Sequence, residues 1–293
     1  MPILSHTMPE SDQEVQERIK EVFGFTPCLW QIRVVRAILN GDDVITIAKT
    51  GSGKSMTYWM PVLFIKYGIS VIVTPLKLLG SQFAQMLEDN HISAISITAA
   101  NATNELFEVN LSIGFSYFTR LIFNQNLARG QYQVILVSPE ILNNDSRFED
   151  LWGMKVFVDN LVNLVLDETH IVQEWGGTFR SDYLRIGPIR YLITRKPAVG
   201  LHLGTATLPP QQLDDLMTNL HFQPNHTQIF RMSTDQPNIF FSVHKMEHPL
   251  NSYHDLAFII KLHMTSEDSH PPKFLVFFNS QAEAQAGAKY LCE

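Results

Sequence analysis

The sequence predicts an α/β fold in which a parallel β-sheet carries helices on both faces. Short runs rich in β-branched residues alternate with longer segments of helical character, which is the pattern of such folds. Several runs are apolar throughout, as strands buried on both faces are. A glycine-rich turn also joins one run directly to a helical segment. The carboxyl ends of these strands are therefore where we expect ligands to bind.

The candidate strands share a short length and an apolar character. They are Val44–Ala48, Ser70–Thr74, Ala94–Thr98, Val134–Ser138, Leu161–Leu166 and Gly200–Gly204. The segments between them that have helical periodicity are Ser11–Phe23, Gln31–Leu39, Ser55–Tyr67 and Gln211–Leu220. This order of elements is what a sheet built from strand-helix-strand units requires.

A second pattern begins after Asn225, where the composition becomes polar. New strands are expected at Ile239–Val243 and Phe274–Phe278, so we place a domain boundary near residues 232 to 238. The first domain covers residues 1–232 and the second covers residues 233–293. Because about 60 residues are fewer than the ~100 to 150 of a usual domain, the second is expected to be incomplete.

The apolar and aromatic segment Leu111–Phe123 stands where the alternation predicts a short loop between two strands. A buried extra helix would account for it, and so would an inserted segment that disturbs the edge of the sheet. The residues alone leave both interpretations open.

Composition describes a soluble globular protein and excludes several classes. The 293 residues are 45% hydrophobic and carry a formal net charge of -7, so any contact with nucleic acid must be local. The most basic stretch, Arg180 to Lys196, is equally well explained as a solvated helix face. Two cysteines, Cys28 and Cys292, provide neither a disulfide framework nor a four-cysteine zinc site. Without a signal peptide or an apolar run of ~20 residues, we expect an intracellular protein with no membrane partner.

The segment Ala48–Ser55 reads Ala-Lys-Thr-Gly-Ser-Gly-Lys-Ser and lies between a predicted strand and a predicted helix. This is the context of a phosphate-binding loop, in which glycines let successive backbone N–H groups point at phosphates. Lys54 would neutralise the β- and γ-phosphates of ATP, and the Ser55 hydroxyl would bind Mg²⁺. The alternative is a glycine-rich turn with an accidental lysine. Strand, loop and helix together favour the nucleotide site.

An acidic pair, Asp167 and Glu168, follows the apolar run Leu161–Leu166 and matches a Walker B element. Asp167 would hold Mg²⁺, generally through water, and Glu168 would position and deprotonate the attacking water. Acidic pairs are also frequent on protein surfaces. The position at the end of a buried strand favours the catalytic interpretation.

With these motifs the sequence resembles the superfamily 2 helicases, and within them the RecQ-like DNA helicases. The resemblance spans nearly the whole chain and rests on motifs in the expected order. They are Phe23-Gly24-Phe25 with Gln31, Val73-Thr74-Pro75-Leu76 with Leu79 and Gln82, Val137-Ser138-Pro139-Glu140, and Gly204-Thr205-Ala206-Thr207. The family implies a RecA-like P-loop NTPase domain, followed here by the beginning of a second, incomplete RecA-like domain.

The most specific match is Asp167–Tyr183, which is similar to the DEAH box and aromatic-rich loop of the RecQ group. The resemblance implies a catalytic role for His170 beside Lys54, Asp167 and Glu168. It also implies an ATP site formed by Gln31, Thr50, Gly51, Ser52, Gly53, Lys54 and Ser55. The residues that it places at DNA are Thr74, Pro75, Gln82, Ser138, Pro139, Trp175, Phe179, Arg180, Thr205 and Thr207. By spacing alone Trp175 and Phe179 would be core residues, whereas the family uses them to sense single-stranded DNA.

The sequence departs from the family at three places. Cys28-Leu29-Trp30 fills the stretch where the family usually has an arginine before its glutamine, so Gln31 is expected to contact adenine without the usual guanidinium beside it. Glu174 and Gly177 stand where glutamine and histidine are usual in the aromatic-rich loop. The family's motifs V and VI, with their arginine finger, would lie beyond residue 293. Because such an arginine contributes ~10³ to 10⁵ in rate, this chain alone is expected to hydrolyse ATP weakly.

Three functions are consistent with these motifs. The first is a 3′-to-5′ RecQ-type helicase that acts as a monomer on single-stranded and duplex DNA, in the nucleus if the source is eukaryotic. The second is a truncated or degenerate module that binds ATP and nucleic acid without unwinding. The third, an RNA helicase, is disfavoured by the RecQ-like residues after His170.

Overall fold

The computed structural model describes residues 8–75, 77–98, 102, 132–170, 178–193, 199–240, 242–259 and 273–292. The chain divides into two compact units, Met1–Asp235 and Gln236–Glu293, which are described separately. The segment Leu111–Phe123 and the side chains of Trp175, Phe179 and Arg180 lie outside the described part. No described helix is long and apolar enough to cross a membrane.

The first unit is built on a seven-stranded parallel sheet with the order β3-β4-β2-β5-β6-β1-β7. The strands are β1 (Asp43–Ile47), β2 (Ile69–Val73), β3 (Ala94–Ile97), β4 (Val134–Val137), β5 (Leu161–Leu166), β6 (Gly200–Thr205) and β7 (Thr227–Arg231). The six predicted strands and the parallel α/β class are confirmed. The edge strand β7 was not predicted, because its half-exposed polar residues lack the apolar run of the buried strands.

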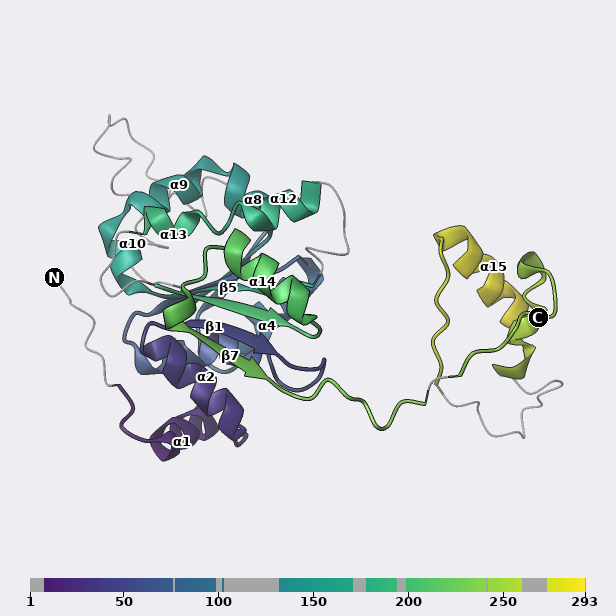
Figure 1. The fold of residues 1–293 in the computed structure, drawn as a ribbon, viewed down its shortest axis with the longest axis horizontal. Coiled ribbons are helices and arrows are strands. Elements are labelled where there is room, and N and C mark those ends of the chain that lie inside the picture. The colour runs from purple at the N-terminus through teal and green to yellow at the C-terminus, as the bar shows by residue number, and fades with distance from the viewer. Residues whose placement is uncertain are drawn as a thin grey trace. The chain divides into compact units, whose positions relative to one another are not determined.

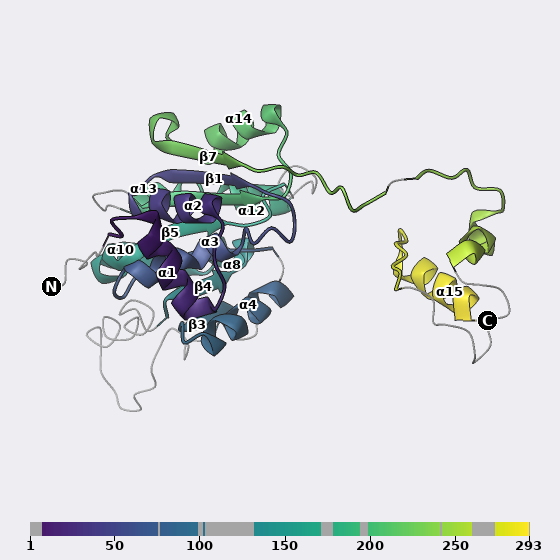
Figure 2. The same cartoon turned by 90° about the horizontal axis from the view of Figure 1, so that it is seen from below.

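Helices cover both faces of this sheet (Figures 1 and 2). One face carries α1 (Asp12–Phe23), α2 (Leu29–Leu39), α3 (Met56–Trp59) and α4 (Lys77–Asp89). The other carries α8 (Pro139–Asn144), α9 (Ser146–Gly153), α10 (Lys155–Asn160), α12 (Thr178–Leu184), α13 (Ile189–Leu192) and α14 (Pro210–Asn219). A 3₁₀ turn, η2 (Pro224–His226), precedes β7. Two large apolar clusters fill the layers, one around Phe148 and Trp152 and the other around Tyr58 and Trp59.

The prediction of one continuous helix over Ser55–Tyr67 is wrong. The structure has the short α3, followed by the 3₁₀ helix η1 (Met60–Phe64). Pro61 lies at the start of η1 and cannot donate the backbone hydrogen bond that a continuous α-helix needs there. The apolar residues are nevertheless buried as a helix through this region would bury them.

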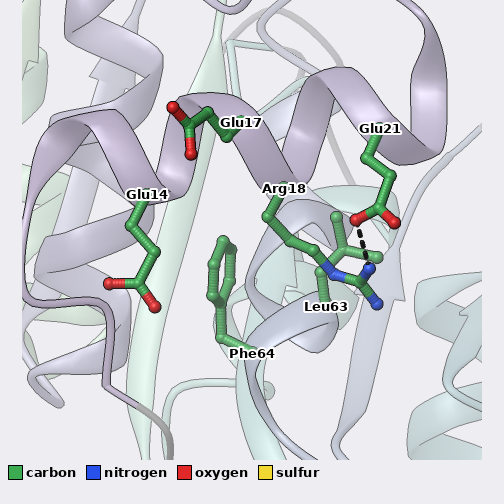
Figure 3. Close-up of a pocket in the computed structure, with 6 residues that line it drawn as sticks. All are labelled: Glu14, Glu17, Arg18, Glu21, Leu63 and Phe64. Carbon is green, nitrogen blue, oxygen red and sulfur yellow. Dashed lines mark hydrogen bonds and ion pairs between the residues drawn. The ribbon is translucent and has the colours of Figure 1, made fainter.

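Helix α1 begins and ends at residues that the sequence marks clearly. The Ser11 hydroxyl accepts a hydrogen bond from the Glu14 N–H, and Gly24 ends the helix with a φ of 73°. The helix packs Val15 and Ile19 towards η1, while a surface hollow above Leu63 and Phe64 is rimmed by charged side chains (Figure 3). These are Glu14, Glu17, Arg18 and Glu21, with an ion pair between Arg18 and Glu21.

A buried ion pair fixes the amino end of β1. The Asp43 carboxylate lies 3.0 Å from the Arg190 guanidinium and accepts hydrogen bonds from the backbone N–H groups of Leu201 and Gln223. Each oxygen is therefore satisfied, which a carboxylate this deeply buried requires. These bonds tie β1 to β6 and to the segment before β7, and so hold the strand that delivers the glycine-rich loop.

The second unit contains the 3₁₀ helices η3 (Leu250–Ser252) and η4 (His254–Ile259) and the helix α15 (Gln281–Cys292). The strands predicted at Ile239–Val243 and Phe274–Phe278 are wrong, because their described residues form no strand. A strand needs a neighbour to pair its backbone groups, and the described residues of this unit provide none. Accordingly, the side chains of Val243 and Phe277 are 99% and 88% exposed.

Candidate nucleotide and nucleic-acid site

The predicted motifs lie together at the carboxyl ends of the parallel strands. The glycine-rich loop follows β1, Thr74 follows β2, Ser138 follows β4 and Asp167 follows β5, while Thr205 ends β6. The strands are parallel and end in register, with Ile47 opposite Thr205, and Val73 opposite both Val137 and Leu166. Residues separated by more than a hundred positions therefore lie along the same carboxyl edge, where open α/β sheets bind ligands.

The glycine-rich loop has the backbone of a phosphate cradle. Gly51 and Gly53 have φ angles of 81° and 80°, in the left-handed region that favours glycine. The Ala48 N–H donates to the Thr205 carbonyl at 3.1 Å, which fixes the start of the loop to β6. Lys54 is 6% exposed, and the Ser52 hydroxyl is buried without a hydrogen-bond partner. The loop thus holds a cation and a free hydroxyl at the edge of the sheet.

Gln31 is held against this loop. Its side-chain oxygen accepts from the Cys28 N–H at 2.8 Å, and its Nε2 donates to the Gly53 carbonyl at 3.0 Å. A Cβ on residue 53 would lie 2.7 Å from the same Nε2, so a glycine is needed for this approach. The residue predicted to contact adenine is therefore also a support for the phosphate loop, and one of its two amide hydrogens remains for a ligand.

Asp167 is held from three directions. Its carboxylate Oδ1 accepts a hydrogen bond of 2.6 Å from the Tyr58 hydroxyl, and its carbonyl accepts one of 2.8 Å from the Tyr183 hydroxyl. Its N–H donates to the Val73 carbonyl at 2.9 Å. Burial raises the pKa of this carboxyl, while the charge of Lys54 and the bond from Tyr58 oppose that rise. Tyr58 and Tyr183 were not among the predicted site residues.

Glu168 and His170 connect the acidic segment to the end of β6. Glu168 has a φ of 51°, an uncommon conformation for a residue with a side chain and one that recurs at active sites. Its Oε2 lies 3.3 Å from His170 Nδ1, which lies 3.3 Å from the Thr205 hydroxyl. That hydroxyl donates to the Thr207 carbonyl at 3.0 Å. Two of the predicted catalytic residues, Glu168 and His170, are therefore next to each other, and His170 contacts the Gly204–Thr207 segment.

Comparison of the sequence with models of protein families shows the family of this chain. A family model described as "DEAD/DEAH box helicase" matches residues 28–216, from just before α2 into α14. The chain belongs to the DEAD/DEAH box helicase family. The match contains the glycine-rich loop, the Asp167–His170 segment and the end of β6.

Relatives of this helicase chain are of the RecQ type. ATP-dependent DNA helicase Q5 of Rattus norvegicus is 29% identical over 242 residues, which are 80% of this chain and 22% of that protein. ATP-dependent DNA helicase RecQ of Haemophilus influenzae is 27% identical over 233 residues, 79% of this chain and 34% of that protein. The chain thus spans about a fifth to a third of the length of these relatives.

Solved helicase structures share the fold. DUF1998 helicase MrfA bound to DNA and AMPPNP matches with a TM-score of 0.54 and 14% identity, over 79% of this chain and 30% of that one. DEAD-box helicase Mss116 bound to ssRNA and UDP-BeF matches with a TM-score of 0.50 and 19% identity, over 79% of this chain and 44% of that one. The predicted RecA-like fold of the first unit is confirmed.

The residues that the resemblance places at DNA differ in exposure. Gln82 and Thr207 are exposed, and Pro75 is half-buried. Thr74, Ser138, Pro139 and Thr205 are buried. Ser138 caps α8, with its hydroxyl accepting from the Ile141 N–H. Side-chain contact with a strand is therefore open to Gln82 and Thr207 but not to the four buried residues.

The helicase site fits ATP with a divalent cation. The described residues include no cluster of three or more His, Cys, Asp or Glu side chains that could hold a metal alone. Mg²⁺ bound to a nucleotide needs few protein ligands, because phosphates and water complete its shell. The glycine cradle, Lys54, the unpaired Ser52 hydroxyl and the buried Asp167 carboxylate fit such a complex, in which Ser55 and Asp167 would hold the metal.

A buried polar group lies beneath the loop. His202 on β6 is fully buried, its Nε2 lies 3.0 Å from the Thr46 hydroxyl on β1, and its ring meets the Tyr58 ring edge-on at 5.1 Å. Burial, together with the nearby Lys54 charge, lowers the pKa of His202 to about 3. This imidazole is therefore neutral throughout the physiological range.

We expect the unfolding free energy of the helicase domain to fall as the pH drops below about 6.5. The folded pKa of His202 is about 3 and the unfolded value is 6.5, so the unfolded chain binds the extra proton between these values. Each pH unit can remove up to about 1.4 kcal/mol. Urea unfolding at pH 7, 6 and 5 measures this loss. The variant His202→Phe should show a shallower pH dependence, and equal slopes in both proteins would contradict the assignment.

Proposed function

We propose that this chain supplies the ATP-binding lobe of a 3′-to-5′ DNA helicase of the RecQ type, which couples ATP hydrolysis to movement along single-stranded DNA and to duplex unwinding. The observation that carries the proposal is the shared sheet edge, where the phosphate loop, Asp167–His170 and Thr205 are in contact. The RecQ-type relatives support the choice of DNA and of this helicase group.

In the proposed reaction, the loop binds the triphosphate and Lys54 offsets its negative charge. Ser55 and Asp167 would hold Mg²⁺, which would supply Lewis-acid stabilisation of the charge on the phosphates. Glu168 orients a water molecule and takes its proton, and the left-handed backbone at this residue fixes the direction of the carboxylate. His170 lies beside both Glu168 and Thr205, so a movement of Glu168 would reach Thr205 through it. Thr205 donates to the carbonyl of the exposed Thr207, which would move in turn.

Coupling to DNA is proposed to run through α12. Phe179 and Arg180 belong to this helix, and Trp175 precedes it in the sequence. Aromatic side chains stack on bases without reading sequence, as a translocating motor requires. Tyr183 lies on the same helix and donates to the Asp167 carbonyl. A shift of α12 on DNA binding would therefore reach the metal-binding residue through one hydrogen bond. By this proposal, a second lobe closes over the site during each cycle.

The proposal is tested by ATP turnover of a longer protein that adds a complete second lobe to this chain. We expect turnover to rise with single-stranded DNA but not with single-stranded RNA, because binding of the strand favours closure of the two lobes. Trp175→Ala should remove the stimulation and leave the DNA-free rate intact. Tyr191→Ala, which removes an exposed aromatic ring on α13, is the matched control.

Unwinding is tested with the same longer protein and two fluorescent partial duplexes. A duplex with a 3′ single-stranded tail should be separated, and one with a 5′ tail should not. If the protein binds ATP and DNA but separates neither duplex, the second function, a binding module without unwinding, replaces the first. Equal stimulation by RNA and DNA would favour an RNA helicase. The nuclear location stays a prediction, because the relatives include bacterial as well as eukaryotic proteins.

A further inference from the structure

We propose that Tyr58 is a positioning residue for the Asp167 carboxylate, and that Gly204 and His202 hold its hydroxyl in place for that role. The inference rests on the proposed nucleotide site and deepens it. It assigns a function to a tyrosine four positions after Lys54 that no motif of the sequence singled out.

The contact between Tyr58 and Asp167 is short and fully enclosed. The hydroxyl donates to Oδ1 at 2.6 Å, the range of a hydrogen bond to a charged acceptor. Tyr58 is 0% exposed and Asp167 is 2% exposed, so water does not compete for this bond. Together with a backbone hydrogen bond from Glu168, this bond fixes the orientation in which the carboxylate faces a cation or its water.

The backbone of Tyr58 is anchored as firmly as its ring. Its carbonyl accepts hydrogen bonds from the Ser70 hydroxyl at 2.9 Å and from Asn163 Nδ2 at 3.2 Å. Ser70 lies on β2 and Asn163 on β5, the strand that ends immediately before Asp167. Strand β5 thus bonds the backbone of Tyr58 through Asn163 and also leads directly into Asp167. The distance between the Tyr58 hydroxyl and the Asp167 carboxylate is therefore set by this strand.

Space for the hydroxyl is made by Gly204 on β6. A Cβ at that position would lie 1.9 Å from the Tyr58 oxygen, a distance that no packing adjustment of a few tenths of an ångström relieves. On the same strand, the His202 ring meets the Tyr58 ring edge-on, and Thr46 fixes His202. Strand β6 therefore shapes the tyrosine's environment, and Thr205 at its end contacts His170. Tyr58 therefore contacts both the Asp167 carboxylate and the first residue of the Gly204–Thr207 segment.

The test uses the chain as it stands and the variant Tyr58→Phe, which removes the hydroxyl and keeps the ring. A fluorescent ADP analogue is bound at increasing Mg²⁺ concentration and, separately, with EDTA. We expect the Mg²⁺ midpoint to rise about 10- to 100-fold, as for the loss of other groups that orient a metal ligand. Affinity in EDTA should stay unchanged, and high Mg²⁺ should restore full binding. A merely structural loss would lower both affinities together.

The control is Tyr67→Phe, which removes the hydroxyl of a tyrosine that is 49% exposed, and it should not move the midpoint. An unchanged midpoint in a folded Tyr58→Phe protein would overturn the inference. If that variant does not fold, Gly204→Ala provides the second test, because it displaces the hydroxyl and should raise the midpoint in the same direction. Failure of the unchanged chain to bind the nucleotide with Mg²⁺ would instead reject the proposed nucleotide site itself.

Discussion

Replacing Lys54 with alanine is expected to lower ATP turnover of the longer, two-lobed protein by on the order of 10²-fold or more. Lys54 is 6% exposed, so its charge acts on the phosphates with little screening by water. No other cation in the loop can replace it, because the Lys49 Nζ is directed to the Asp235 carbonyl at 3.1 Å. On the chain alone, the same substitution should weaken binding of a fluorescent ATP analogue, which titration measures directly.

Lys49→Ala is the matched control for this substitution. It removes the same charge from the same loop, but the Lys49 Nζ bonds to the Asp235 carbonyl, so turnover should fall less than about threefold. Thermal unfolding of both variants shows whether the fold survives the loss of the buried Lys54 stem. If Lys54→Ala kept most of its turnover in a folded protein, the measured ATPase would lie outside this phosphate loop.

The parts of the fold that the sequence predicts well are those with a strong local signal. A run such as Leu161–Leu166 is apolar at nearly every position, because it is buried on both faces of the sheet. The glycines of the phosphate loop mark a backbone that other residues adopt with strain, and the structure gives both a positive φ. Such signals come from neighbours in the sequence and need no knowledge of distant contacts.

The parts that were missed depend on contacts between distant segments. Tyr58 reads as a core aromatic residue after the loop, and its role depends on Asp167 and Gly204, which are more than a hundred positions away. The edge strand β7 is stabilised by pairing with β1 and not by apolar residues of its own. The strands expected at Ile239–Val243 and Phe274–Phe278 show the converse case, in which a strong local propensity has no partner strand in the described unit.

Glu168→Gln is expected to reduce ATP turnover by about 10² to 10⁴-fold while nucleotide binding persists. Glutamine keeps the size of the side chain but cannot take a proton from water, so the loss falls on the chemical step. Glu168 Oε2 also lies 3.3 Å from His170 Nδ1, and glutamine keeps a polar group of the same size beside His170. Single-turnover hydrolysis by the longer protein, measured beside binding of the fluorescent ATP analogue, separates the two effects.

The control for Glu168 lies at the other end of the same strand. Asp159 precedes β5, forms an exposed ion pair with Lys155 and contacts neither the loop nor the acidic segment in the described structure, so Asp159→Asn should leave both measurements unchanged. The comparison discriminates between a base and a binding residue. If Glu168→Gln lost nucleotide affinity in proportion to turnover, Glu168 would act in binding, and the attacking water would be activated by another group. If affinity held and turnover fell, the left-handed backbone at Glu168 would be explained as the conformation that directs its carboxylate at that water.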